Sequence, residues 1–239
     1  MKQDSPFYRR CFEVVSQSPL FINHDKKMIQ DALLPFCRET WMKNSPSISS
    51  EKALYRFYII IAGRLKVFQV NPITGREQIL FILGPGDAFD IICLLDGKEH
   101  VVNTMAIDDL EVLFAPVDEV RAWIGRHAEF NRTFLPYLGK QIREIEELAS
   151  DLSLYDTGTR LSKLILSHVH PNHSRGELEL INDLSHEEIA NMIGSVRVIV
   201  NRHIQHLKKE GIIKTSRKHM EISNLHSLAS KVEKHIGLQ

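Results

Sequence analysis

The sequence has few cysteines, no long apolar run and no excess of charge of either sign. Its 239 residues include only Cys11, Cys37 and Cys93, which are too few and too widely spaced for a disulfide scaffold or a local metal site. The longest apolar run, Phe57–Ala62, is far shorter than the roughly 20 residues that span a bilayer. The first residues carry no apolar signal core, so we expect a cytoplasmic protein with no membrane partner.

Glycine and proline are also scarce, and the charges cancel. The 12 glycines and 9 prolines are too few for a fibrous or low-complexity chain. Lys plus Arg and Asp plus Glu number 30 each, so the formal net charge is zero. The charge of the whole chain therefore predicts no partner, and only its distribution along the sequence can.

The first half of the chain alternates short β-rich runs with turns. The runs are residues 58–63, 65–70, 78–83 and 110–114, and the turns are residues 71–75 and 84–87. Many short strands without helices between them predict an antiparallel barrel or jelly roll. We assign this effector-sensing domain to residues 1–118.

A heptad pattern follows, in the region 119–154. We expect a long helix over about residues 129–152, in which apolar residues step by 4, 3, 4 and 3: Leu138, Ile142, Ile145, Ala149 and Leu152. Such a seam favours a parallel two-helix contact and hence a homodimer. The alternative is an amphipathic helix that lies on its own barrel.

A second module is expected over residues 155–239. Residues 153–158 form a short break that can serve as a hinge, and a helix follows over residues 160–168. A polar stretch, residues 171–176, then leads into a short strand at residues 178–181.

The most informative motif begins at Ser185. Ser185 and Glu188 have the spacing of a capping box, which opens a helix over residues 186–193. Gly194 ends that helix, and a second helix over residues 196–210 turns Val200, Ile204 and Leu207 inward. A short helix, a glycine turn and a second helix are typical of the helix-turn-helix.

A basic segment surrounds the second helix. Residues 212–215 and 219–222 flank the basic turn 216–218 and predict a β-hairpin wing. From Arg197 to Lys218 there are seven Lys or Arg residues and one acid, Glu210. A plain helical hairpin with a solvated basic surface is the alternative, but this local charge favours DNA phosphate as the partner. The candidate DNA contacts are Ser185, Ser195, Arg197, Val198, Asn201, Arg202, Lys208, Lys209, Arg217 and Lys218.

The order of barrel, heptad helix, hinge and winged helix-turn-helix resembles the CRP/FNR family of bacterial transcription regulators. Residues 58–63, 84–89 and 184–194 carry the resemblance, which covers almost the whole chain. It implies an α+β fold with a cyclic-nucleotide-binding-like β-roll (a cupin-like jelly roll), a dimerisation helix and a C-terminal winged helix-turn-helix. It also implies a homodimer on a two-fold symmetric promoter site in double-stranded DNA, with RNA polymerase as a further partner.

The effector segment departs from the cyclic-nucleotide members of that family. Their ribose-binding Glu falls on Ile91, and their phosphate-binding Arg-Ser pair falls near His100 and Val101. A cyclic phosphate is a permanent anion that needs a guanidinium fork or several amide donors, so cAMP is not expected as effector. A small effector other than cAMP, or none, is expected in a pocket formed by Phe89, Ile91, Cys93, His100, Val101 and Met105.

Two further readings of the barrel remain. A four-cysteine iron–sulfur cluster is excluded by three scattered cysteines, but haem is possible, with His100, Cys93 or Met105 as axial ligand in a CO- or NO-sensing regulator. The alternative roles are a buried small residue for Cys93, core packing for Met105 and an exposed loop position for His100. A cupin-type metalloenzyme is not expected, because the barrel has only His24 and His100 and no His-x-His.

The reading helix departs from the family as well. Arg197 and Arg202 match the family's two arginines, but Val198 holds the position of a Glu that accepts from cytosine. A valine cannot accept a hydrogen bond, whereas it can pack on a thymine methyl group. We therefore expect Arg197 and Arg202 to contact guanine or phosphate, Asn201 to pair with adenine and Val198 to favour thymine. The later lysines and arginines are expected to contact phosphates.

Overall fold

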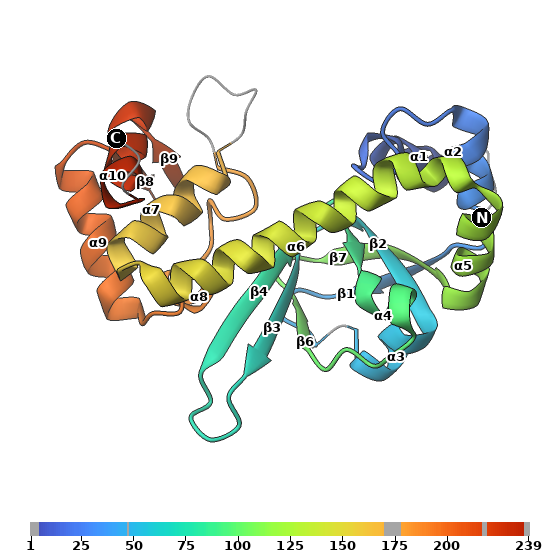
Figure 1. Ribbon diagram of the computed structural model, residues 1–239, viewed down its shortest axis with the longest axis horizontal. Coiled ribbons are helices and arrows are strands. Elements are labelled where there is room, and N and C mark those ends of the chain that lie inside the picture. Colours follow the sequence, from blue (N-terminus) through green and yellow to red (C-terminus); the bar gives the residue numbers. More distant parts are fainter. Residues whose placement is uncertain (1–4, 47, 170–177, 217–218, 237–239) are drawn as a thin grey trace. The chain divides into compact units, whose positions relative to one another are not determined.

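The computed structural model describes residues 5–46, 48–169, 178–216 and 219–236. The chain divides into two compact units, one made of residues 1–69 and 81–143 and the other of residues 70–80 and 144–239 (Figure 1). Each unit is described by itself below.

Two antiparallel sheets form the β-roll. One sheet has the order β1-β7-β2-β5 and the other the order β4-β3-β6. The predicted runs become β2 (Arg56–Ala62), β3 (Leu65–Val70), β4 (Glu77–Leu83) and β7 (Leu110–Pro116). The strands β1 (Cys37–Trp41), β5 (Ala88–Phe89) and β6 (Asn103–Ala106) were not expected. The sequence hides them because β1 carries polar residues in its middle and β5 has only two residues.

Helices both precede the strands and lie between them, so the expectation of a helix-free region was wrong. They are α1 (Pro6–Gln17), α2 (Lys26–Ala32), α3 (Ser50–Tyr55) and α4 (Ile91–Asp96). Ser5, Asp25 and Ser49 each accept a backbone hydrogen bond and cap the first three of them. These caps were present in the sequence, but helices of six or seven residues such as α2, α3 and α4 give little periodicity to read.

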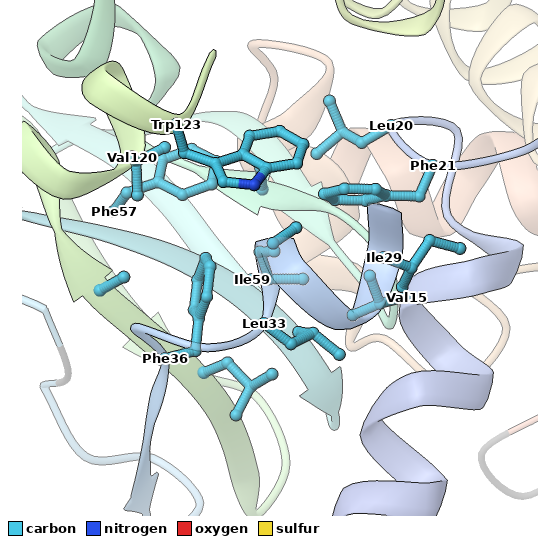
Figure 2. Close-up of a cluster of buried hydrophobic side chains, with 14 of the residues drawn as sticks. Val15, Leu20, Phe21, Ile29, Leu33, Phe36, Phe57, Ile59, Val120 and Trp123 are labelled. Atoms are coloured by element: carbon cyan, nitrogen blue, oxygen red, sulfur yellow. The ribbon is translucent and has the colours of Figure 1, made fainter. Parts of the chain in front are cut away.

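The core of the first unit lies between β2 and the helices. Phe57, Ile59 and Ile61 alternate along β2 and pack against apolar residues from α1, α2 and α5. Figure 2 shows part of this cluster, with Phe57 and Ile59 near the indole of Trp123. The period-2 alternation of β2 therefore places one row of its side chains under a helical layer.

The long helix forms close to its predicted position. It follows α5 (Val117–Arg126) and a 3-10 turn (Ala128–Phe130), and α6 runs over Asn131–Leu154. Its C-terminal end replaces part of the expected break at residues 153–158. Only Tyr155 and Asp156 separate α6 from the next helix, because Asp156 accepts from the backbone amides of Gly158 and Thr159 and caps it.

The second unit contains a helix-turn-helix with a two-stranded wing. Its elements after α6 are α7 (Thr157–Ser167), α8 (His186–Met192), α9 (Arg197–Lys209), β8 (Ile213–Ser216), β9 (His219–Ile222) and α10 (Leu225–Ile236). The strand expected at residues 178–181 does not form. Leu178 makes a single bridge to Val169, and Leu180 has a φ of 60°, which is incompatible with an extended chain.

Candidate nucleic-acid interface

The turn between α8 and α9 is built as the sequence predicted. Ser185 accepts from the amide of Glu188 (3.1 Å), and the Glu188 carboxylate accepts from the amide of Ser185 (2.8 Å). Gly194 has a φ of 62°, a left-handed conformation that glycine adopts without strain. The amide of Ser195 then donates to the carbonyl of Ala190 (2.8 Å), which closes the turn ahead of α9.

The two faces of α9 differ in chemistry. Val200, Ile204 and Leu207 are buried, as expected. Another face exposes Arg197, Val198, Asn201 and Arg202 and, about two turns further on, Lys208 and Lys209. Since residues three and four apart share a face of a helix, these side chains form one exposed stripe, called the α9 face below.

The α9 face combines free cations with an exposed apolar residue. Among the described residues, Arg197, Arg202, Lys208 and Lys209 make no ion pair with a carboxylate. Val198 is 77% exposed and lies between the exposed cations of this face. The face can therefore offer both positive charge and an apolar contact to a polyanion.

The acid at the end of α9 does not neutralise this face. Glu210 pairs with Lys231 of α10 (3.0 Å) and with His206 (3.5 Å). Of the remaining candidate contacts, Ser185 is exposed and Ser195 is half-buried. Arg217 and Lys218, predicted at the tip of the wing, lie outside the described residues.

The N-terminal end of α9 lacks a side-chain cap. Val196 occupies the N-cap position, is 55% exposed and supplies no acceptor to the first amides of the helix. Sequence reasoning did not assign a role to Val196. Uncapped amides and the positive end of the helix dipole make such a terminus suitable for an anion such as a backbone phosphate.

The inner face of α9 is held by α7. His203 is half-buried against Gly158, where an added Cβ would lie 3.0 Å from the imidazole Cε1. Burial, together with the charge of Arg202, lowers the pKa of His203 below its ordinary value. The imidazole is therefore neutral at neutral pH and serves as packing under the α9 face.

The predicted heptad seam is largely exposed on α6. Ile142 is 61% exposed and Ile145 and Leu152 are 39% exposed, while Ala149 is also exposed. Leu138 is half-buried against the core of the first unit. Leu135, one heptad before Ile142, is 59% exposed and extends the seam by one position that the sequence reading missed. The alternative was that the apolar face of the helix packs on its own barrel. Of the predicted seam residues, only Leu138 packs against the core of the first unit.

The expected effector segment folds around a buried carboxylate. Asp90 precedes α4, and its side chain is 2% exposed. The imidazole Nδ1 of His100 lies 3.1 Å from Asp90 Oδ1, and the thiol of Cys93 donates to Asp90 Oδ2 (3.3 Å) and to the carbonyl of Lys98 (3.1 Å). Asp90 was not among the predicted residues, although an acid followed by the apolar start of a helix is a cap signal.

This Asp90–Cys93–His100 cluster alters two pKa values. Hydrogen bonding to Asp90 raises the pKa of His100, although burial works in the opposite direction. Burial, followed by the Asp90 charge, raises the pKa of Cys93 to about 12. Cys93 is therefore a protonated buried thiol, and His100 is half-buried and paired rather than an exposed loop residue.

The other predicted pocket residues differ in solvent exposure. Phe89 and Ile91 are buried, Met105 is half-buried in β6 and Val101 is 73% exposed. The described residues contain no group of three His, Cys, Asp or Glu side chains that could hold a metal ion. In the same part of the chain, no helix is long and apolar enough to cross a membrane.

Comparison with known proteins matches both parts of the chain. The cyclic nucleotide-binding domain matches residues 40–127, and the Crp-like helix-turn-helix domain matches residues 159–231. A CRP-like cAMP-activated global transcriptional regulator from Mycobacterium tuberculosis is 30% identical over 178 residues, 74% of this chain and 79% of that protein. A global nitrogen regulator from Nostoc sp. is 26% identical over 213 residues, 87% of this chain and 95% of that protein.

The fold recurs in solved structures. FixK2 from Bradyrhizobium japonicum superimposes with a TM-score of 0.72 at 19% identity, over 82% of this chain and 97% of that one. At this identity the likeness concerns the fold alone.

Proposed function

This chain belongs to the CRP/FNR family of transcription regulators, whose members are not enzymes and bind DNA through the helix-turn-helix, and we propose that it acts as a dimer that reads a two-fold symmetric DNA site with the α9 face. The observation that carries this proposal is the exposed stripe of unpaired cations on α9. A DNA-bound helix of this kind lies in the major groove with its N-terminal residues at the base edges.

The α9 face divides the contacts by position. Arg197 and Arg202 can donate to guanine, Asn201 can pair with adenine and Val198 can pack on a thymine methyl group. Lys208 and Lys209 lie further along the helix, where they meet phosphates and set affinity without specifying sequence. Ser185 at the start of α8, Ser195 in the turn, and Arg217 and Lys218 in the wing are assigned to the DNA backbone in the same way.

Dimerisation would come from the seam on α6. Exposed Leu135, Ile142, Ile145 and Leu152 need a partner to leave water, and the same seam on a second copy supplies one. A two-fold dimer places its reading helices about 34 Å apart, one turn of DNA, and so requires a palindromic site. RNA polymerase is the further partner that the family implies.

A selection experiment tests this proposal. Duplexes bound from a random library should contain an inverted repeat, and Arg197→Ala/Arg202→Ala should lose at least about 30-fold in affinity for them, since each arginine contact is worth about 1–3 kcal/mol. Lys27→Ala/Arg126→Ala is the matched control, because it removes two exposed cations of the first unit. Equal losses in both variants, or a non-repeating site, would contradict the proposal.

We propose further that cAMP is not an effector of this chain, although the relative from Mycobacterium tuberculosis is named as cAMP-activated. The segment offers the buried Asp90 carboxylate together with Ile91 and Val101, and none of these attracts an anion. A ligand at 100 times its dissociation constant would stabilise the protein by about 2.7 kcal/mol. Millimolar cAMP should therefore leave the melting temperature unchanged, and a clear increase would contradict this part of the account.

Haem remains the second candidate effector, and it depends on His100. A buried thiol with a pKa of about 12 does not fit a thiolate ligand, so Cys93 is unsuitable. His100 fits better, because Asp90 at Nδ1 orients the ring and leaves Nε2 for a metal. An absorbance scan of protein purified from haem-supplied cells separates the two cases: a strong haem band that disappears in His100→Gln would favour haem.

A further inference from the structure

An apolar recess lies in the first unit, between the N-terminal helices and the start of α6. It is lined by thirteen residues, all of them apolar or aromatic, from α2, β2, α4, α5, the 3-10 turn, α6 and the loops at residues 20–21 and 35–36. Figure 2 shows several of them, with Phe57 beside Trp123, Phe21 across from the indole, and Ile59 and Phe36 below. The effector-segment residues Asp90 and His100 are not part of its lining.

The recess is large enough for a guest. It holds about 400 Å³ of space free of atoms, including a part open to solvent, and about 20 Å³ of that space admits the centre of a water-sized sphere. On the latter measure about 10–15 Å³ is enough for one water molecule. The open part gives a small molecule a way in.

Water is a poor occupant of this space. A buried water molecule needs two to four polar partners, and no lining side chain offers one into the recess. The only polar side-chain atom among the lining residues, the indole Nε1 of Trp123, already donates to Asp31 Oδ2 (2.8 Å). Cavities lined by such side chains stay dry and accept apolar guests instead.

We propose that this recess is a binding site for a small, uncharged, apolar molecule of a few heavy atoms. Such a molecule would contact Trp123 of α5, Phe130 of the 3-10 turn and Phe134 of α6. These rings are already in contact, with centroids 5.2 Å apart for Trp123–Phe130 and 5.3 Å for Phe130–Phe134. An occupant therefore bears directly on the first turn of α6. The proposal is independent of the DNA-binding function.

Xenon is a suitable probe, because it is apolar, monatomic and quenches the fluorescence of an indole that it touches. The chain has two tryptophans, so Trp41→Phe leaves Trp123 as the only reporter. In the full-length Trp41→Phe protein, quenching of Trp123 should saturate as the xenon pressure rises, as expected for a bound atom. Purely linear, collisional quenching would overturn the proposal.

Two further variants in the same background test the location. Ala32→Leu places a larger side chain in the recess and should abolish the saturable component, whereas Ala122→Leu, the same change at an exposed position of α5, should keep it. If Ala32→Leu does not fold, Ile59→Val enlarges the recess by one methylene group and should strengthen xenon binding. Equal saturation curves in all variants would place the xenon elsewhere and overturn the site.

Discussion

The α9 face and the Asp90–Cys93–His100 cluster both contain polar groups, but those on α9 face solvent, whereas those of the cluster are bonded to one another. On α9, the arginines and lysines are exposed and have no carboxylate partner among the described residues. Around α4, the carboxylate, thiol and imidazole are buried or half-buried and bond to one another. Unpaired surface charge is available to an external polyanion, whereas an internally paired cluster is already satisfied.

This contrast explains why one half of the function is easier to assign than the other. The helix-turn-helix keeps the positive charge that DNA phosphate requires, and Val198 is the one position of α9 for which we propose a base contact that differs from the family pattern. The effector segment keeps the fold of a cyclic nucleotide-binding domain but places a carboxylate, Asp90, at its centre. A shared fold therefore does not by itself determine the ligand.

The largest effect is expected from breaking the heptad seam on α6, because the proposed binding of the α9 face to palindromic DNA requires a dimer. Ile145→Asp places facing carboxylates in the proposed dimer contact and should yield monomers, with a loss of binding to palindromic DNA. Leu154→Asp is the control, since Leu154 is 72% exposed on α6 and lies off the heptad positions. Sedimentation that finds both variants dimeric would remove the seam from the account.

A smaller effect is expected in the Asp90–Cys93–His100 cluster. The pKa of His100 is raised by Asp90, so the pair stabilises the folded chain fully below the unfolded pKa of about 6.5 and loses this contribution as the pH rises through the folded value. His100→Gln should therefore cost about 1.5–3 kcal/mol at pH 6, the range for a hydrogen bond to a charged group, and clearly less at pH 9.

Tryptophan fluorescence can follow this unfolding, because Trp41 and Trp123 both belong to the first unit. His226→Gln, at an exposed histidine of α10 for which no carboxylate contact is found among the described residues, is the control and should show no such pH-dependent difference. A cost of His100→Gln that is equal at pH 6 and pH 9 would mean that the ion pair does not form.

The smallest effect is expected for one phosphate contact. Lys208→Ala should weaken binding to all duplexes alike and lower the slope of log affinity against log salt by about one. Titrations at several salt concentrations measure it, with Lys27→Ala as a control of equal charge. A change of sequence preference in Lys208→Ala would instead place Lys208 at a base.

The helix-turn-helix could be predicted because its signals are local. The capping box, the glycine turn and the inward spacing of Val200, Ile204 and Leu207 all lie within about two dozen consecutive residues. The helix α9 starts one residue later and ends one residue earlier than expected. Exposure of Val198 followed from the same spacing, because a helix with one buried face must expose the other.

The effector segment could not be predicted because its contacts are tertiary. Asp90 and His100 are ten residues apart and meet only after α4 and the following loop have folded. The strand expected at residues 178–181 failed for a related reason: its apolar spacing was correct, but Leu180 adopts a positive φ that spacing does not reveal. The recess near Trp123 likewise depends on packing among six helices and strands and two loops.

The central claim is that α9 reads DNA and that Val198 replaces a cytosine contact with a thymine contact. The most direct measurement is selection from duplexes with randomised half-sites, performed on the natural chain and on Val198→Glu. The account predicts an inverted repeat for both, with one position of each half-site changing from thymine to cytosine, at about 1–3 kcal/mol of discrimination. An identical consensus from both proteins would contradict the base-reading role of Val198, and the absence of any consensus would contradict DNA reading by α9.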